Sequence, residues 1–590
     1  MPPHPSRLHC PRAWLRGVCF ALTSVLTAAA LTACGGGGAE SSDPNGENSR
    51  AQSLPRTDDE AHRFLTQATF GPRAEDIARV RSIGYEQWME EQLATPVMGT
   101  HLALVDASAA LKSRKPNSVD MAYSWWTHAV QDHSAQLRHK VAFALSQIFV
   151  VSTVPFDESR MVASYLDMLT AKSDGTYRDL LEGVALHPAM GQYLSHLSNR
   201  KEDGAGRVPD ENFAREVMQL FSIGLYELDD SGKPKVINGQ AVETYNASDI
   251  KGLARVFTGF SWHWPSAKSA VDWWKCFWRA SECKDASQET TAMSAYAAEH
   301  ATTQKDFLGV SVPAQASADP KASLKVALDR LASHPNTAPF ISRQLIQRLV
   351  TSNPSDQYVA EITRVFRSSG GNLKSVVKEI LLHSEARLPG STQASTSTYG
   401  KVREPVLRLA HLLRAIPHSS AQYSGSSSAS GRFYQAVETG DPGHELGQTP
   451  MRAPSVFNFY RPGYRPPQTK VADQGLVAPE MQITTETSVL GYANFTAGIL
   501  ENGWGEWNAS LGRSDVQFEF SGWTSLSTNP SALIDAIAAR MIGHNLSDAA
   551  RSPAIAAIEA MPSSSAYEKR QRIQAAILLV AVSPDFVIQQ

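Results

Sequence analysis

Cysteines and the short motifs of well-known enzyme mechanisms are both scarce in this sequence. The 590 residues include five cysteines, and no two of them form a C-x-x-C pair. The patterns H-E-x-x-H, G-x-S-x-G and G-x-x-x-x-G-K-[ST] are also absent, and the nearest approach to the zinc pattern, H-E-L-G-Q at residues 444–448, lacks the second histidine. These absences argue against the corresponding mechanisms, a zinc peptidase among them, and we predict no metal site and no cofactor.

The sequence also lacks an excess of basic residues. It has 55 Lys and Arg against 58 Asp and Glu, so that the formal net charge is -3. A mildly acidic chain offers no electrostatic surface to nucleic acid, and we predict no nucleic-acid partner. Hydrophobic residues make up 42% of the chain, which is enough for a sizeable core.

The N-terminus has the pattern of a bacterial lipoprotein signal. Three arginines within the first 16 residues precede an acid-free apolar run over residues 17–33, and residues 31–34 (L-T-A-C) have the residue order of a lipobox. We therefore predict a signal peptide at residues 1–33, cleavage before Cys34 and lipidation of its sulfur. The alternative is a simple secretory signal in which Cys34 has no role.

The residue after Cys34 indicates the destination of such a lipoprotein. Gly35 rather than aspartate follows the cysteine, which is typical of lipoproteins sent to the outer membrane of a Gram-negative cell. We expect a stable membrane anchor at Cys34, because two or more acyl chains bury enough CH₂ groups. The body would then face the periplasm or the cell surface.

Composition divides the remaining chain into a tether and a body. Residues 34–57 are rich in Gly, Ser, Asp and Asn, which predicts a flexible tether, and residues 58–590 form the body. Serine-rich stretches at residues 390–400 and 419–430 are candidate joints within it. Cys276 and Cys283 are the two cysteines of the body, and in an oxidising compartment we predict that they form a disulfide.

The apolar residues of the body repeat with helical spacing almost throughout. Strand-like stretches are limited to Val236–Ile237 and Val516–Phe520. The predicted fold class is all-α, a multi-helix globular body with minor short β-hairpins. The main predicted helices cover residues 137–151, 161–170, 177–186, 212–221, 248–258, 324–331, 338–350, 358–366, 373–382, 404–416, 530–542 and 567–582.

Ordered sequence blocks along the body resemble a known family. Residues 61–72 read A-H-R-F-L-T-Q-A-T-F-G-P, residues 210–224 read D-E-N-F-A-R-E-V-M-Q-L-F-S-I-G, and residues 453–464 read A-P-S-V-F-N-F-Y-R-P-G-Y. With further blocks at residues 244–260 and 334–346, they resemble the DUF1800 family, large bacterial exported proteins of unknown function. The resemblance covers nearly the whole body.

The resemblance also implies a partner, and the chain departs from the family pattern at two points. Related proteins often occur beside an exported family called DUF1501, which resembles sulfatases, so that a protein of this kind is the expected partner. Asp210 stands where the pattern usually has Asn. Ala301 follows His300 where the family tends to have Asp, which removes a His–Asp pair from that block.

The block at residues 210–224 contains the candidate catalytic residues, Glu211, Asn212, Arg215 and Glu216. On a helix, Asn212, Arg215 and Glu216 share one face, and Glu211 lies one turn before Arg215. This polar face is consistent with a pocket in which a buried Glu216 acts as general acid or base. It is equally consistent with an ion-pair network that fixes helix packing.

A second candidate surface is the aromatic-rich region around the two body cysteines. Trp262, Trp264, Trp273, Trp274 and Trp278 lie within 17 residues. Aromatic faces stack on sugar rings, but aromatic clusters more often pack into a core.

Two functions from different classes follow. The main prediction is a lipid-anchored helical scaffold at the cell envelope that binds an exported partner protein. The alternative is an envelope hydrolase of polysaccharide or peptidoglycan, with Glu216 or Glu211 as acid or base and Arg215 orienting an anionic group.

Overall fold

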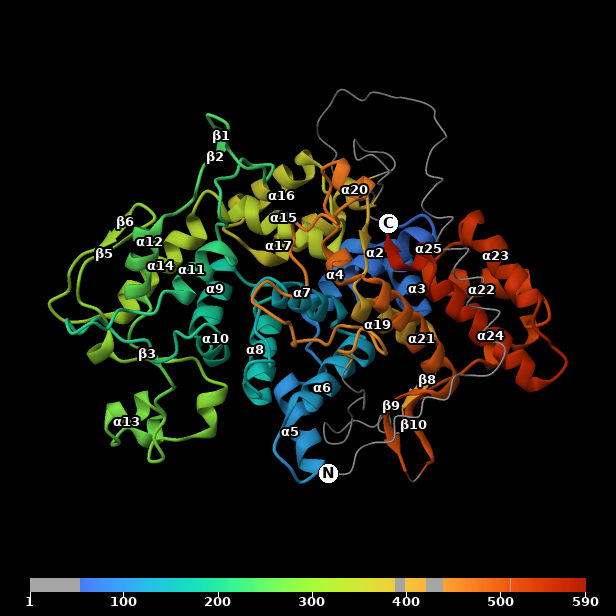
Figure 1. Ribbon diagram of the computed structural model, residues 1–590, viewed down its shortest axis with the longest axis horizontal. Coiled ribbons are helices and arrows are strands. Elements are labelled where there is room, and N and C mark those ends of the chain that lie inside the picture. Colours follow the sequence, from blue (N-terminus) through green and yellow to red (C-terminus); the bar gives the residue numbers. More distant parts are fainter. Residues whose placement is uncertain (1–53, 388–397, 421–438, 510) are drawn as a thin grey trace.

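The computed structural model describes residues 54–387, 398–420, 439–509 and 511–590 (Figure 1). The predicted signal peptide, Cys34 and most of the predicted tether lie outside these ranges, as do most of the two serine-rich stretches. The described chain is mainly helical, and its strands are short and antiparallel. The predicted fold class is therefore confirmed.

The first helices occupy the middle of the molecule (Figure 1). The side chain of Thr57 caps α2 by accepting a hydrogen bond from the Glu60 amide, and Asn117 and Asp120 form a capping box on α6. These caps fix the helix starts from local sequence. The helices are α2 Asp58–Ala68, α3 Ala74–Ile83, α4 Tyr85–Ala94, α5 His101–Leu111, α6 Ser118–Gln131, α7 Gln136–Ser146 and α8 Ser159–Ala171.

The next segment forms the side of the molecule drawn in green in Figure 1. Its strands are two or three residues long and pair as hairpins or small ladders, for example Val236 with Ala241 in β1 and β2. The helices and strands are α9 Tyr177–Leu186, α10 Pro188–Tyr193, α11 Asn212–Gln219, β1 Val236–Ile237, β2 Gln240–Ala241, α12 Ala247–Val256, β3 Phe260–Ser261, α13 Trp273–Phe277, β4 Ser294–Ala295, β5 Lys305–Phe307, β6 Val310–Val312 and α14 Pro320–Ser333.

The last segment crosses the centre, forms the opposite side of the molecule, drawn in red, and then turns back toward the centre, where the C-terminus lies (Figure 1). The closing strand β11 pairs with β7, where Ile588 lies opposite Val402. The elements are α15 Thr337–Leu349, α16 Asp356–Ser368, α17 Leu373–Leu382, α18 Ser384–Arg387, β7 Lys401–Val402, α19 Pro405–Ala415, β8 His418–Ser420, α20 Lys470–Asp473, α21 Glu486–Asn502, β9 Trp504–Asn508, β10 Arg513–Phe518, α22 Pro530–Ile542, α23 Asp548–Glu559, α24 Ala566–Ala581, α25 Pro584–Val587 and β11 Ile588–Gln589.

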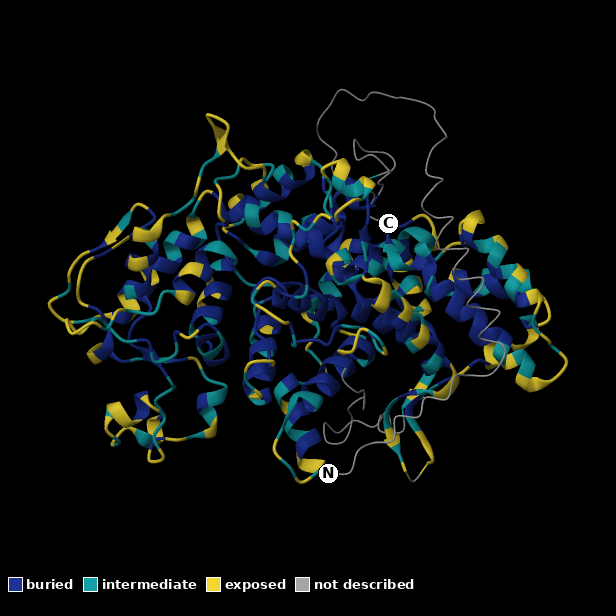
Figure 2. Ribbon diagram, in the orientation of Figure 1, coloured by how far each residue is buried: buried dark blue, intermediate teal, exposed yellow. Residues whose placement is uncertain are grey.

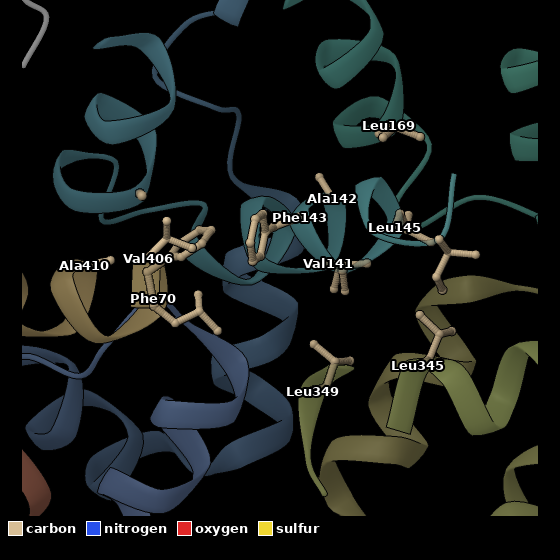
Figure 3. Packing of buried hydrophobic residues seen from close by; sticks show 14 of the residues in the cluster. Phe70, Val141, Ala142, Phe143, Leu145, Leu169, Leu345, Leu349, Val406 and Ala410 are labelled. Atoms are coloured by element: carbon tan, nitrogen blue, oxygen red, sulfur yellow. The ribbon is translucent and has the colours of Figure 1, made fainter. Parts of the chain in front are cut away.

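Part of the main hydrophobic core surrounds α7 (Figure 3). Val141 and Phe143 of this helix lie in one apolar cluster with Leu345 of α15 and Val406 of α19. Each fully buried side chain of this size contributes roughly 1.5–3 kcal/mol. Burial is densest in the middle of the molecule, and exposed residues gather on its outer helices and hairpins (Figure 2).

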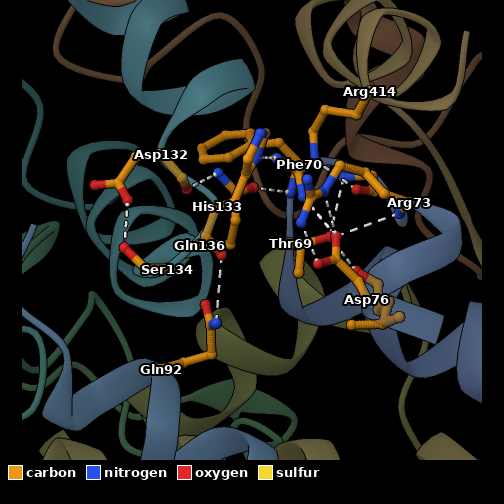
Figure 4. Close-up of polar contacts among 12 residues, drawn as sticks. Thr69, Phe70, Arg73, Asp76, Gln92, Asp132, His133, Ser134, Gln136 and Arg414 are labelled. Atoms are coloured by element: carbon orange, nitrogen blue, oxygen red, sulfur yellow. Dashed lines mark hydrogen bonds and ion pairs between the residues drawn. The ribbon is translucent and has the colours of Figure 1, made fainter. Parts of the chain in front are cut away.

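Charged side chains are also buried in the centre. The carboxylate of Asp76 accepts hydrogen bonds from Arg73 at 2.7 Å and from the fully buried Arg414 at 3.0 Å (Figure 4). Lys401 and Glu480, both almost fully buried, form an ion pair at 2.9 Å. Losing one partner of such a pair would leave an uncompensated buried charge, which is strongly destabilising.

Among the described residues, no helix combines the length and the hydrophobicity needed to cross a bilayer.

Candidate functional site

The predicted catalytic residues lie at the start of α11, and the structure does not gather them into one network. Arg215 forms an ion pair with Glu211 at 3.5 Å, and both side chains are more than a third exposed. Asn212 is exposed as well. An exposed pair of this kind contributes little to stability, because solvent screens it.

Glu216 differs from these neighbours because it is buried. Its Oε2 atom has no hydrogen-bond partner among the described residues. Burial raises the pKa of its carboxyl, and the charge of Arg215 only partly opposes that rise. None of the cavities described below is lined by a residue of α11.

The largest cavity described is an open cleft of about 780 Å³ between α9, the β3–β4 region and α14. Its walls are largely apolar, with Phe260 and Met293 buried in them and Trp264 half-buried. Clefts of several hundred Å³ with apolar walls and a few polar groups are typical of ligand-binding sites. The remaining lining residues are Arg178, Glu182, Leu186, Pro265, Ser266, Ser269, Ser294, Ala295, Lys321, Leu324 and Lys325.

The charged residues of the cleft are mostly cationic. Arg178 pairs with Glu182 at 2.6 Å and with Asp329 at 2.8 Å, and Lys325 reaches the same Asp329 at 2.5 Å. Lys321 is exposed and has no ion-pair partner among the described residues. Glu182 is the one acidic residue that lines the cleft. The rim therefore favours a ligand that carries negative charge.

Trp264 connects this cleft to the disulfide region. Its ring stacks on Tyr296 with a centroid separation of 6.0 Å, and its Nε1 donates a hydrogen bond to the carbonyl of Lys268. Tyr296 also belongs to a small apolar cluster with Phe277 and with Cys276 and Cys283, which form a disulfide with a Cα–Cα distance of 5.0 Å. The disulfide therefore supports one wall of the cleft.

Three further tryptophans of this region differ in their surroundings. Trp273 packs against the disulfide cluster, whereas Trp274 and Trp278 are exposed. The guanidinium of Arg200 lies 5.0 Å from the ring centroid of Trp274 and 5.9 Å from that of Trp278. The aromatic-rich stretch is thus divided between a cluster, a cleft wall and a surface cation–π group.

A further cluster, which sequence analysis did not single out, lies inside the molecule at the junction of α6 and α7. His128 on α6, Asp132 directly after it and His139 on α7 are all buried. One ligand-type atom from each residue lies within 4.8 Å of the other two. The sequence signal was the spacing H-x₃-D-x₆-H, which differs from the standard zinc patterns considered above.

Comparison with known proteins identifies the family. A family model described as "Protein of unknown function (DUF1800)" matches residues 63–588. The chain belongs to the DUF1800 family. No curated protein and no solved structure matches it.

The DUF1800 blocks in this chain lie largely in its interior. The block at residues 61–72 supplies most of α2, and the block at residues 334–346 opens α15, which is almost wholly buried. In the block at residues 453–464, Tyr460 is buried and its ring centroid lies 5.0 Å from the guanidinium of Arg348. These blocks therefore specify mainly the packing of the body, and Phe260 is the one residue of the cleft wall that they contain.

Proposed function

We propose that this DUF1800 protein is a lipid-anchored envelope protein whose body binds an exported partner through the cleft between α9 and α14. The observation that carries the proposal is the combination of apolar walls and a cationic rim in one open cavity. The proposed ligand is an extended acidic segment of the partner protein. Apolar side chains of that segment would pack on Trp264 and Phe260, and its carboxylates would lie near Lys321.

Binding explains the charged residues of the cleft better than hydrolysis does. Acid–base cleavage of a glycosidic bond usually needs two carboxyl groups placed across the substrate. One acidic residue, Glu182, lines the cleft, and it is already paired with Arg178. On α11, Glu211 is paired at the surface and Glu216 is buried away from the described cavities. The hydrolase alternative therefore has less support than the scaffold.

The partner class and the location belong to the same proposal. A DUF1501 protein, of the exported sulfatase-like family, is the proposed partner. The proposed location is the outer membrane of a Gram-negative cell, to which the lipid on Cys34 would anchor the protein.

Replacing Cys34 by serine would remove the sulfur that takes the lipid. When cells are labelled with a radioactive fatty acid, the wild type should take up the label and C34S should not. Equal labelling of C34S and the wild type would contradict the anchor.

Affinity capture from solubilised envelopes tests the binding role. The full-length protein is compared with Lys321→Glu in the cleft and with Lys251→Glu, which reverses an exposed charge on α12. We expect the wild type and K251E to capture the same partner, and K321E to retain less than about a tenth of it, since like charges at a binding surface cost several kcal/mol. Higher salt should weaken capture, because it screens exposed charges.

Two outcomes would contradict the proposal. Equal capture by K321E and the wild type would remove the cleft from the binding surface. The absence of any reproducible envelope partner for the folded wild type would remove the scaffold role itself.

A further inference from the structure

We propose that His128, Asp132, His139 and His101 form a closed binding site for a divalent transition metal, with Zn²⁺ as the best-suited ion. The site is separate from the cleft and does not depend on partner binding. The four side chains come from α5, α6 and α7 and from the turn between the last two. Imidazole and carboxylate together are the donor set that suits Zn²⁺ and related ions.

The donor atoms already lie close to the spacing of a metal centre. The Oδ2 atom of Asp132 is 2.9 Å from Nε2 of His139 and 3.8 Å from Nδ1 of His128. In a tetrahedral site with bonds of about 2.1 Å, donor atoms lie roughly 3.4 Å apart. An ion could therefore enter with small side-chain shifts.

The positions of the three imidazole rings agree with the same geometry. The ring centroid of His128 is 4.3 Å from that of His101 and 4.5 Å from that of His139, and the last two are 6.2 Å apart. Tetrahedral coordination by imidazoles places the ring centroids roughly 5 Å apart. His101 lies beside the three residues whose donor atoms are already grouped, and its imidazole is the fourth ligand that we propose.

His128 gives an independent indication that the cluster holds a ligand. The residue is 2% exposed, and neither of its ring nitrogens has a hydrogen-bond partner among the described residues. A buried polar group left without a partner costs roughly 1–3 kcal/mol. A metal ion at the centre of the cluster would satisfy one of these nitrogens.

The residues around the cluster hold the ligands in place. Asp132 accepts a hydrogen bond from the Met98 amide at 2.8 Å. It accepts another from the Ser134 hydroxyl at 3.0 Å (Figure 4). Nδ1 of His101 is 2.7 Å from the hydroxyl oxygen of Ser124, which leaves Nε2 as its other ligand atom. Such outer contacts orient the ligands of metal sites and fix the imidazole tautomers.

The surroundings indicate a structural site. The cavity at the cluster has a volume of about 10 Å³, which is near the lower limit for a single water molecule. Phe70, Trp125, Phe143 and Leu166 also line it and leave no room for a substrate. A metal here would join α5, α6 and α7 at the edge of the main core.

Metal analysis of the full-length protein, purified without a histidine tag, tests the site. The chain is stripped with a chelator and titrated with Zn²⁺ alone or Co²⁺ alone. We expect one ion per chain and the visible absorption of tetrahedral Co²⁺. Asp132→Asn and His139→Gln should lower the affinity at least tenfold, the lower end of the range for changes near a metal. His196→Gln is the control, because His196 is an equally buried histidine outside the cluster.

Three results would overturn the proposal. The first is a folded wild type that binds no Zn²⁺. The second is binding of Zn²⁺ by D132N and H139Q with the affinity of the wild type. The third is a loss of Zn²⁺ affinity in H196Q as large as that in D132N and H139Q. If D132N and H139Q fail to fold, X-ray absorption of the Zn²⁺-loaded wild type decides the question. A first shell of imidazoles and one carboxylate would support the site, and any other ligand set would overturn it.

Discussion

Glu216 shows at the scale of a residue why the polar face of α11 was open to two interpretations. Helical spacing puts Phe213 and Val217 on the face of α11 opposite Asn212 and Arg215, and the structure buries both. It could not determine how far the opposite face is covered, because that depends on segments distant in sequence. The structure buries Glu216 and leaves Arg215 one position earlier at the surface.

Replacing Glu216 by glutamine should stabilise the protein at neutral and alkaline pH. Burial raises the pKa of this carboxyl above its ordinary value of 4.5, so the folded state resists its ionisation. Stability from a raised carboxyl pKa is present at low pH and is lost as the pH rises through the folded-state pKa. E216Q should therefore unfold about 1 °C higher than wild type at pH 8 and at nearly the same temperature at pH 4.

Thermal unfolding followed by circular dichroism at both pH values measures this difference. Glu211→Gln is the control, since it changes a partly exposed carboxylate at the N-cap of the same helix. A lower unfolding temperature of E216Q at pH 8 would mean that the ionised carboxylate is a required hydrogen-bond acceptor. Unchanged stability of E216Q with loss of biological activity would instead favour the hydrolase.

Lys140 on α7 should make the stability depend on pH in a second range. Burial, with a smaller contribution from the charge of Lys401, lowers the pKa of Lys140 from 10.5 to about 7. The cost of its buried charge is full below pH 7 and disappears as the pH approaches 10.5. Lys140→Met should therefore raise the free energy of unfolding by on the order of 3 kcal/mol at pH 6.5, and by much less at pH 10.

Urea unfolding of K140M and wild type across this pH range tests that expectation. Lys251→Met, at an exposed position, should show no comparable trend. A K140M protein that is less stable at every pH would show that the ammonium contact with the Phe70 ring outweighs desolvation.

At the scale of elements, local signals predicted some helices to the residue. α9 and α17 span the predicted ranges, because the side chains of Thr176 and Asn372 cap their first turns. α6 was not predicted, since 11 of its 14 residues are buried and no polar face reveals the helical period. The histidine cluster was therefore missed together with the helix that carries His128.

The cleft could not be predicted from the sequence either, because its residues come together only in the tertiary structure. Its walls come from Arg178, Trp264 and Lys321, which are far apart in the chain. Taken singly, each of these residue types is common on a protein surface or in a small apolar cluster. Helical spacing gives no information on which helices become neighbours. Only the tertiary arrangement combines them.

The disulfide around α13 should control local stability with little effect on the rest of the molecule. Cys276 and Cys283 belong to a small apolar cluster that is separate from the main core. Reduction would remove a short-range cross-link, which constrains the unfolded chain less than a long one. We expect faster proteolytic cleavage within residues 264–296 and an almost unchanged unfolding temperature.

Limited proteolysis with mass spectrometry, with and without reductant, checks this expectation. The Cys276→Ser, Cys283→Ser double variant should show the same cleavage without reductant. Loss of the whole thermal transition on reduction would mean that this cluster is essential to the main core.

At the scale of the whole molecule, the C-terminal strand is tied to the central helices. The side-chain amide of Gln589 donates hydrogen bonds to the carbonyls of Leu349 at 2.9 Å and Val350 at 2.8 Å. Gln589→Ala would leave both buried carbonyls without this donor, at a cost of roughly 2 kcal/mol in the free energy of unfolding. Urea unfolding measures the loss, and Gln590→Ala, at an exposed neighbour, is the control.

The two ends of the described body also lie beside each other. Asp59 and His62 of α2 line a cavity of about 120 Å³ with Ile588 and Gln589 of β11. A chain that emerges from the ribosome or a secretion channel N-terminus first must present α2 long before its neighbour exists. Contacts over such sequence separations slow folding and expose apolar surface meanwhile. α2 can therefore complete its packing only after β11 has been synthesised. A chaperone that shields α2 during that delay should raise the yield of native protein.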